Sequence, residues 1–323
     1  IGYRSPWHWH NDRRKMAKIF RHHVGAWRLC PGPRLAPGVY HAVCQSGTSP
    51  AAGNTAGEPL ILDAGMNEIL SLDKAQMRYG DGTRALDGLS LDFPSASFTA
   101  LVGPSGCGKS TALRLLAGLL APTGGNVTIP TRDQIGFVFQ DPTLLAWKSA
   151  YDNIALPLKI AGHTRADINQ RVGYALDLVG LSGRGAALPR ELSGGMKMRV
   201  SLARALASEP RILLLDEPFA ALDELTRLRL DDDLLHIWQQ SKCTVVFVTH
   251  SISESAYLAE RVAVLTNTGQ LAHIENISPP ATREGFRSAS AYHRAMGNIA
   301  AALGHDLNHD FGENLSASRG SAS

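Results

Sequence analysis

Cysteine is scarce in this chain. The 323 residues include four, Cys30, Cys44, Cys107 and Cys243, and no two of them form a Cys-x-x-Cys pair. The small number argues against a secreted disulfide framework, and the spacing argues against a structural zinc site. The pattern favours a reducing, cytoplasmic compartment.

Long hydrophobic runs and a strong excess of one charge are also missing. No uninterrupted apolar stretch approaches the eighteen residues that a membrane-spanning helix requires. The net charge is +3, but residues 1–57 carry eight basic residues and one acid, a net +7, which leaves −4 for residues 58–323. A mildly acidic body argues against nucleic acid as the main partner, so we expect none.

Residues 1–65 differ in composition from the rest of the chain. They are rich in Trp, His, Arg, Pro and Gly, and show no sustained period of 2 or 3.6. Met66 stands directly before the first strand-like run, so one interpretation is a natural start at Met66 preceded by a disordered or non-native extension. A transit peptide and a basic, aromatic surface-binding arm are the alternatives.

From residue 69 onward, short apolar runs alternate with helical patterns. This alternation predicts an α/β fold with a mainly parallel central sheet. Asp81-Gly82 is a turn signal within an earlier hairpin-like region. The predicted strands are Ile69–Leu72, Phe98–Val102, Ile135–Phe139, Ile212–Leu215 and Thr244–Val248.

A glycine-rich loop follows the run Phe98–Val102 and fits the pattern G-x-x-x-x-G-K-[ST]. Glycines allow backbone N–H groups to surround a phosphate chain, Lys109 neutralises the outer phosphates, and the Ser110 hydroxyl can reach Mg²⁺. The sequence therefore predicts a phosphate-binding loop for a nucleoside triphosphate. Its residues are Gly103, Pro104, Ser105, Gly106, Cys107, Gly108, Lys109, Ser110 and Thr111.

The run Ile212–Leu215 ends in two carboxylates, Asp216 and Glu217. Mg²⁺ takes oxygen ligands, so a buried strand that delivers Asp216 at its tip suits a magnesium–nucleotide site. Glu217 would then lie beyond the γ-phosphate, where a carboxylate can polarise an attacking water. By itself the pair would indicate an exposed turn; the phosphate loop in the same chain favours the catalytic interpretation.

Three further elements are weak signals when taken singly. Leu192-Ser-Gly-Gly195 precedes a helix-forming run, Gln140 follows Ile135–Phe139, and His250 follows Val245–Val248. Their order and spacing, together with Ala221-Leu-Asp223, resemble the nucleotide-binding subunit of ATP-binding cassette (ABC) transporters. The resemblance covers about residues 69–275, and the Leu-Ser-Gly-Gly element makes it very specific among phosphate-loop proteins.

The resemblance implies a role for each matching residue. Tyr79 resembles the aromatic side chain that stacks on adenine, and Gln140 the residue that senses Mg²⁺ and water while linking to the membrane partner. Ser193, Gly194 and Gly195 would contact the γ-phosphate bound to an opposite subunit. Asp223 matches the loop that joins two subunits, and His250 the switch residue that holds the γ-phosphate and the catalytic water.

One position departs from the commonest family pattern. Met196 stands where Gln is usual after Leu-Ser-Gly-Gly. Together with Asp141-Pro-Thr-Leu-Leu145, Trp147 and Asp152-Asn-Ile-Ala-Leu-Pro157, this methionine is similar to the nitrate, sulfonate and taurine branch of importers. The motif residues face ATP, so nothing in them touches a transported solute.

The resemblance implies an ATPase that powers an importer. Expected partners are ATP and Mg²⁺, a second identical subunit, permease subunits and, indirectly, a solute-binding protein, at the cytoplasmic face of the inner membrane. The main alternative is a soluble regulatory or nucleic-acid-associated cassette protein. An exporter half and a phosphate-loop kinase are further alternatives that fit the sequence less well. The expected organisation begins with an extension at 1–65, followed by an ABC-type ATPase domain at 66–278. This domain is expected to contain an N-terminal antiparallel β subdomain and a helical subdomain at about 150–200. A C-terminal helical segment at 279–303 and a mobile tail at 304–323 are expected to follow.

Overall fold

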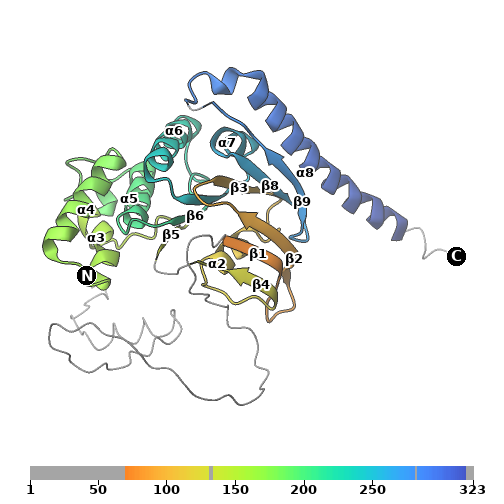
Figure 1. The fold of residues 1–323 in the computed structure, drawn as a ribbon, viewed down its shortest axis with the longest axis horizontal. Helices are drawn as coiled ribbons and strands as arrows, with labels where there is room; N and C mark the ends of the chain where they lie inside the picture. The colour runs from red at the N-terminus through yellow and green to blue at the C-terminus, as the bar shows by residue number, and fades with distance from the viewer. Residues whose placement is uncertain (1–69, 131–133, 281, 318–323) are drawn as a thin grey trace, which may run out of the picture. The chain divides into compact units, whose positions relative to one another are not determined.

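The computed structural model describes residues 70–130, 134–280 and 282–317, all within one compact unit. Two sheets organise this part of the chain (Figure 1). The first is antiparallel, in the order β2-β1-β4, and the second has the order β5-β6-β7-β3-β8-β9. The expectations for residues 1–65 lie outside the described residues.

The antiparallel sheet begins with a hairpin. β1 (Leu70–Arg78) pairs with β2 (Arg84–Phe93), and β4 (Gly124–Thr128) adds to the other edge of β1. The turn contains Asp81 and Gly82, whose φ of 88° is readily adopted only by glycine. The predicted N-terminal antiparallel subdomain is thus confirmed.

The second sheet is parallel except at one edge. Parallel pairing joins β5 to β6, β6 to β7, β7 to β3 and β3 to β8, whereas β9 runs antiparallel to β8. The predicted mainly parallel core is therefore confirmed. The strands are β3 (Phe98–Val102), β5 (Ile135–Val138), β6 (Ile212–Asp216), β7 (Thr244–Val248), β8 (Arg261–Leu265) and β9 (Leu271–Asn276).

Both faces of the central strands are covered, which explains why β6 and β7 are largely apolar. On β7, Val245 and Phe247 enter one hydrophobic cluster, whereas Val246 and Val248 enter a second. Alternate residues of a strand point to opposite faces, so a strand buried on both faces must be apolar throughout. Helix α2 (Lys109–Leu116) lies between the two sheets, with contacts to β1 and β2 on one side and to β6 and β7 on the other.

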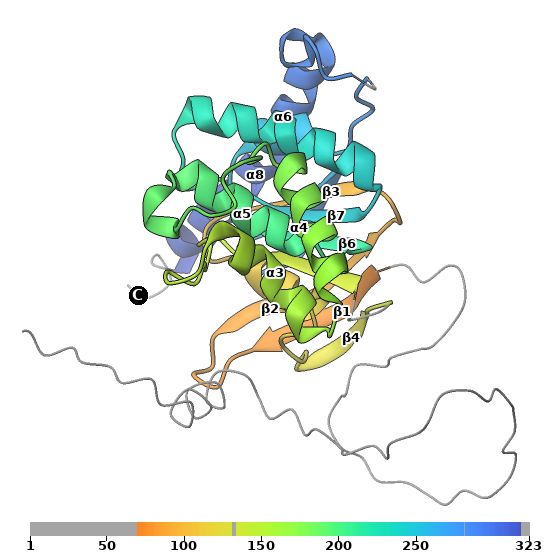
Figure 2. The ribbon, with the colours of Figure 1, turned by 90° about the vertical axis from the view of Figure 1, so that its left-hand side faces the viewer.

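Helices α3, α4 and α5 form a helical group beside the parallel sheet (Figure 2). Each begins at a hydroxyl side chain, Ser149, Thr164 or Ser193, that accepts a hydrogen bond from a backbone N–H of the first turn. Such caps satisfy N–H groups that the helix itself leaves unpaired. The bounds are α3 (Ala150–Ile160), α4 (Arg165–Leu178), a short 3₁₀ turn (Pro189–Glu191) and α5 (Gly194–Leu206).

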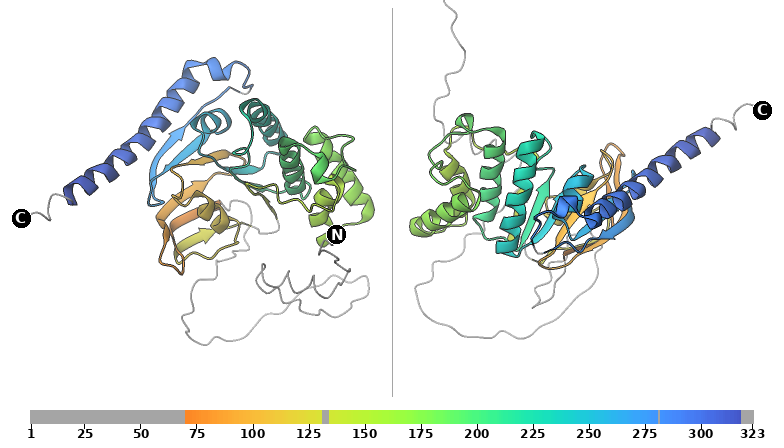
Figure 3. Two further views of the ribbon diagram at one scale, coloured as in Figure 1. Left: turned by 180° about the vertical axis from the view of Figure 1, so that it is seen from behind. Right: turned by 90° about the horizontal axis from the view of Figure 1, so that it is seen from above.

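The C-terminal part of the described chain contributes to the same hydrophobic cluster as α3, α4 and α5. α6 (Glu224–Ser241) and α7 (Ile252–Leu258) precede a 3₁₀ turn (Phe286–Ser288) and the long helix α8 (Ser290–Ala317). Ile299 of α8 is fully buried in the larger cluster, and the start of α8 lies against α7 while the helix follows β9 (Figure 3).

The helix α8 extends beyond the C-terminal helical segment expected at 279–303, because it continues to Ala317. The expected mobility of residues 304–323 stays a prediction.

Among the described residues, none of the helices is both long enough and apolar enough to cross a membrane.

Candidate functional site

The predicted phosphate-binding loop connects β3 to α2 and is held by close backbone contacts. Gly108 has a φ of 96°, and a Cβ atom there would lie 2.1 Å from the carbonyl oxygen of Ala85. A Cβ at Gly103 would lie 2.8 Å from Sγ of Cys107. Both positions require glycine, because a larger residue would push the loop off the hairpin or off its own cysteine.

Lys109 lies inside this loop. Its side-chain ammonium donates hydrogen bonds of 2.8 Å to the carbonyl oxygens of Gly103 and Pro104, and the residue is 5% exposed. The loop carbonyls therefore hold the positive charge at the point where the backbone turns. Burial raises the pKa of the neighbouring Cys107 thiol, so this cysteine stays protonated at neutral pH.

Ser110 and Asp216 come together although 106 positions separate them in sequence. The Ser110 hydroxyl donates a 2.8 Å hydrogen bond to Oδ1 of Asp216. Burial raises the pKa of the Asp216 carboxyl, while the hydrogen bond from Ser110 acts in the opposite direction. A hydroxyl and a carboxylate at this separation provide the hard oxygen ligands that Mg²⁺ prefers.

Glu217 and His250 form the second pair. β6 and β7 are parallel neighbours, with Asp216 in register with Val248, so their carboxyl ends deliver both residues to one edge of the sheet. His250 Nδ1 lies 3.3 Å from Glu217 Oε2. The Glu217 backbone N–H donates to the Val248 carbonyl, and its φ of 45° turns the chain sharply after the strand.

Tyr79 lies near the phosphate loop. Its hydroxyl and that of Thr111 form a 3.1 Å hydrogen bond, and the tyrosine is half-buried. The structure thus places the predicted adenine-stacking residue beside the helix that leaves the loop. Ser105, Gly106 and Gln140 are exposed; Gln140 follows β5 by two residues.

The Leu-Ser-Gly-Gly element forms the start of α5. Ser193 Oγ accepts a 3.3 Å hydrogen bond from the Met196 backbone N–H. The space beside Gly194 and Gly195 is taken by Leu222 and Thr226, at the start of α6. Among the described residues, no hydrogen bond or ion pair joins this helix start to the phosphate loop of the same chain.

Asp223 caps α6. Its carboxylate accepts a 2.7 Å hydrogen bond from the Thr226 hydroxyl and a 3.0 Å bond from the Thr226 backbone N–H. These bonds hold the pKa of Asp223 below its usual range. Asp223 is exposed, and the preceding residue, Leu222, lies beside Gly194.

Sequence reasoning missed three polar residues that surround these loops: Arg227, Thr249 and Glu254. Thr249 and Glu254 are buried, and Arg227 is half-buried. The signal that could have found them is position: Arg227 follows Asp223 by four residues, and Glu254 follows His250 by four.

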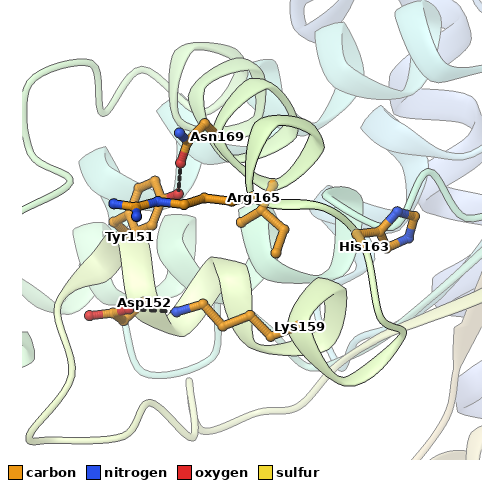
Figure 4. Close-up of a pocket in the computed structure, with 7 residues that line it drawn as sticks. Tyr151, Asp152, Lys159, His163, Arg165 and Asn169 are labelled. Atoms are coloured by element: carbon orange, nitrogen blue, oxygen red, sulfur yellow. Dashed lines mark hydrogen bonds and ion pairs between the residues drawn. The ribbon is translucent and has the colours of Figure 1, made fainter.

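A separate hollow of about 500 Å³ lies between α3 and α4 (Figure 4). Lys159 pairs with Asp152 at 2.8 Å, and the Tyr151 hydroxyl donates a hydrogen bond to Asn169. None of the predicted site residues lines it. Within this hollow Lys159 is paired with Asp152 and Tyr151 with Asn169, so these four polar side chains already have partners in the protein.

Comparison with known proteins agrees with the geometry. Residues 86–220 match the family model described as ABC transporter. The chain is 46% identical to a taurine import ATP-binding protein of Rhizobium johnstonii, over 61% of this chain and 79% of the relative. It is 44% identical to an aliphatic sulfonates import ATP-binding protein of Bacillus subtilis, over 60% of this chain and 77% of the relative.

Solved structures show the same fold. A dimeric ATP-binding cassette in a post-hydrolysis state, bound to ADP and Pi, is 31% identical to this chain with a TM-score of 0.58. The match covers 65% of this chain and all of the cassette.

Proposed function

The chain belongs to the ABC transporter family of ATP-binding proteins, and on that premise we propose that it is the ATP-hydrolysing subunit of an importer for taurine or a related small sulfonate. The observation that carries the proposal is the arrangement at the carboxyl ends of three strands. The phosphate loop follows β3, Asp216 and Glu217 end β6, and His250 follows β7. Ligands of open parallel sheets bind at this edge.

ATP would bind with its phosphates along the phosphate loop. Backbone N–H groups from Gly103 to Thr111 and the start of α2 would surround the β- and γ-phosphates, and Lys109 would leave the loop carbonyls to neutralise their charge. Tyr79 would stack on the adenine ring. The hydrogen bond between Tyr79 and Thr111 supports this placement, because it fixes the ring beside the loop.

Hydrolysis would depend on the pair Glu217 and His250. Glu217 would orient a water molecule for in-line attack on the γ-phosphorus and accept its proton, and His250 would donate a hydrogen bond to the γ-phosphate. The 3.3 Å contact between the two side chains supports these roles, since it places the base and the phosphate-binding imidazole on one reaction centre.

Mg²⁺ would be held by Ser110 and Asp216, with Gln140 as a further oxygen donor. When bound, the ion would neutralise charge on the β- and γ-phosphates. The Ser110–Asp216 hydrogen bond supports the assignment, because it holds two oxygen ligands together.

A second identical subunit would complete each site. Gly194 and Gly195 lie beside Leu222 and Thr226 of their own chain, and Ser193 and Gly194 are exposed. We infer that the N-terminus of α5 binds the γ-phosphate held by the phosphate loop of the partner, with Asp223 in the contact between subunits. Dimeric assembly of the similar cassette structure supports this arrangement.

Permease subunits are the membrane partners implied by the import relatives. An apolar hollow of about 360 Å³ lies between the end of β5 and α3, lined in part by Phe139, Leu156 and Ile160. Ile160 is 76% exposed, and Gln140 follows directly after Phe139. We infer that a permease helix docks here, at the cytoplasmic face of the inner membrane, and that a solute-binding protein acts indirectly through that permease.

Replacement of the proposed base tests the function. We expect Glu217→Gln to retain ATP binding, lose ATP turnover by about 100-fold or more, and accumulate as a dimer in Mg-ATP. ATP hydrolysis by the full chain and its size by chromatography are the measurements. Glu209→Gln, which changes an exposed carboxylate paired with Arg171, is the matched control and should turn over ATP at the wild-type rate. Undiminished hydrolysis by Glu217→Gln would contradict the assignment of the base.

A further inference from the structure

The residue directly before His250 is tied to the body of the protein by a buried carboxylate. The Thr249 hydroxyl donates a 2.5 Å hydrogen bond to Oε2 of Glu254, and it accepts a 3.0 Å bond from the Ser251 backbone N–H. Thr249 is 2% exposed and Glu254 is 5% exposed. The side chain of Glu254 thus fixes the backbone from which His250 projects.

The other oxygen of Glu254 faces Arg227, which extends toward the loop of Asp223. Nε of Arg227 lies 3.2 Å from Glu254 Oε1, and Nη2 donates a 3.0 Å hydrogen bond to the carbonyl oxygen of Leu222. Arg227 therefore holds the backbone next to Asp223, and Glu254 holds the backbone next to His250. One ion pair joins these two loops.

A contribution to stability alone is a weak explanation for this pair. Desolvation of a buried ion pair often costs as much as the attraction returns, so apolar residues of similar size can replace such pairs without loss. The environment of Glu254 is also unfavourable for charge: burial raises its pKa, although the hydrogen bond from Thr249 and the charge of Arg227 act in the opposite direction. A role in geometry explains the pair better.

We propose that Arg227, Glu254 and Thr249 are positioning residues that transmit subunit contact at the Asp223 loop to the catalytic His250. The inference rests on the proposed function. When a partner subunit contacts the loop of residues 221–223, a shift of the Leu222 carbonyl moves Arg227. Arg227 carries Glu254 and Thr249 with it, and His250 is set against Glu217 and the γ-phosphate. Hydrolysis is thereby confined to the assembled dimer.

Removal of the Arg227 charge tests the link. We expect Arg227→Met to lower the turnover number for ATP by about tenfold or more, since small misplacements at a reacting centre are costly. The KM for ATP should stay within about twofold, because none of the three residues is part of the phosphate loop. In the Glu217→Gln background, Arg227→Met should still form the ATP-bound dimer.

Arg199→Met is the matched control. Arg199 also joins a carboxylate, Asp233 at 2.5 Å, to a backbone carbonyl, that of Val179 at 3.0 Å, and it contacts neither loop. Thermal unfolding of both variants would measure the loss of stability. Arg199→Met should lose stability to a similar degree and keep the wild-type turnover number.

A double-mutant cycle with His250 separates positioning from general damage. If Arg227 acts through His250, Arg227→Met should change turnover by less than about twofold in a His250→Ala background, because the residue it positions is already gone. Equal losses in both backgrounds would overturn the inference. So would a turnover number for Arg227→Met equal to that of the wild type.

The paired charges allow a further check. Arg227→Met with Glu254→Gln removes both charges, leaves no unpaired buried ion, and keeps an acceptor for Thr249. We expect the double variant to recover thermal stability without recovering turnover. Recovery of both together would overturn the inference and assign the pair to stability. Failure of the wild-type chain to hydrolyse ATP would instead overturn the proposed function, and this inference with it.

Discussion

Asp231 is a buried carboxyl group in the middle of α6. It is 2% exposed, and Arg287 Nη2 lies 3.2 Å from its Oδ2. Burial, followed by the nearby charge of Glu254, raises the pKa of Asp231 to about 8, although Arg287 lowers it and Asp232 contributes a further repulsion. Two carboxylates that share a buried region cannot both ionise cheaply. Each has an arginine at 3.2 Å, Arg227 beside Glu254 and Arg287 beside Asp231.

Replacement of Asp231 by Asn should change how stability depends on pH. The folded pKa of about 8 lies above the ordinary aspartate value of 3.8, so the folded protein binds more protons between these pH values and loses stability as pH rises through them. Asp231→Asn lacks this group. We expect the variant to gain thermal stability relative to the wild type as pH rises from about 5 to 8.

Thermal unfolding at several pH values measures this difference. Asp73→Asn is a suitable control, because Asp73 is an exposed carboxylate on β1 of the antiparallel sheet. A constant difference between Asp231→Asn and the wild type across the pH range would contradict the prediction.

At the scale of the element, the start of α5 has two functions that can be separated. Ser193 caps the helix, and the proposed function also places it against ATP bound to a partner subunit. Ser193→Ala should lower the free energy of unfolding by about 0.5–2 kcal/mol, the usual cost of a lost cap. It should also lower ATP turnover, because the helix N-terminus loses a hydroxyl donor to the γ-phosphate.

Thr164→Ala is the matched control for this prediction. Thr164 caps α4 in the same way, through the backbone N–H of Asp167, and is exposed. Chemical denaturation should show a similar loss for both variants, while an ATPase assay should show a loss for Ser193→Ala alone. A normal turnover number in Ser193→Ala would remove this residue from the ATP site.

Strands β3, β5, β6 and β7 of the parallel sheet were predictable from sequence, because strands buried on both faces form short apolar runs. Strands β8 and β9 of the same sheet were not predicted. Phe98–Val102 and Thr244–Val248 were predicted with the bounds that the structure shows. The bounds of α8 were not predicted: a helical segment was expected at 279–303, whereas α8 spans Ser290–Ala317. Small and polar residues are frequent beyond residue 304, and composition alone does not mark where a helix ends.

The site divides in the same way. Lys109, Ser110 and Asp216 were predictable because each lies in a short sequence motif, the phosphate loop or the end of an apolar strand. The structure brings Ser110 and Asp216 into contact. Arg227 and Glu254 could not be predicted as a pair. Their contact depends on how α6 packs against α7, which the sequence does not show. From the sequence alone, a charged residue at either position would be assigned to the solvent-exposed face of its helix.

At the scale of the described unit, α8 contributes to the main hydrophobic cluster. Ile299 is fully buried, with Tyr292 and Ala295 from the same helix in the same cluster. Ile299→Ala should lower the free energy of unfolding by about 2–5 kcal/mol, because it leaves a cavity in a packed core. Urea denaturation without nucleotide measures the loss.

Ala301→Ser, at an exposed position on the same helix, should change the unfolding free energy by less than about 0.5 kcal/mol. If Ile299→Ala were as stable as this control, α8 would not pack against the core in solution.

The pairing of β3 has a consequence for synthesis of the chain. β3 carries the phosphate loop, yet its neighbours are β7 and β8, with Phe98 opposite Val245 and Thr99 opposite Arg261. A ribosome that adds about 5–20 residues per second needs roughly 7–30 s to pass from β3 to its first partner. During that interval β3, in which four of the five residues are apolar, has neither of its neighbouring strands to pair with. Nucleotide can therefore assist folding only after synthesis has passed β7.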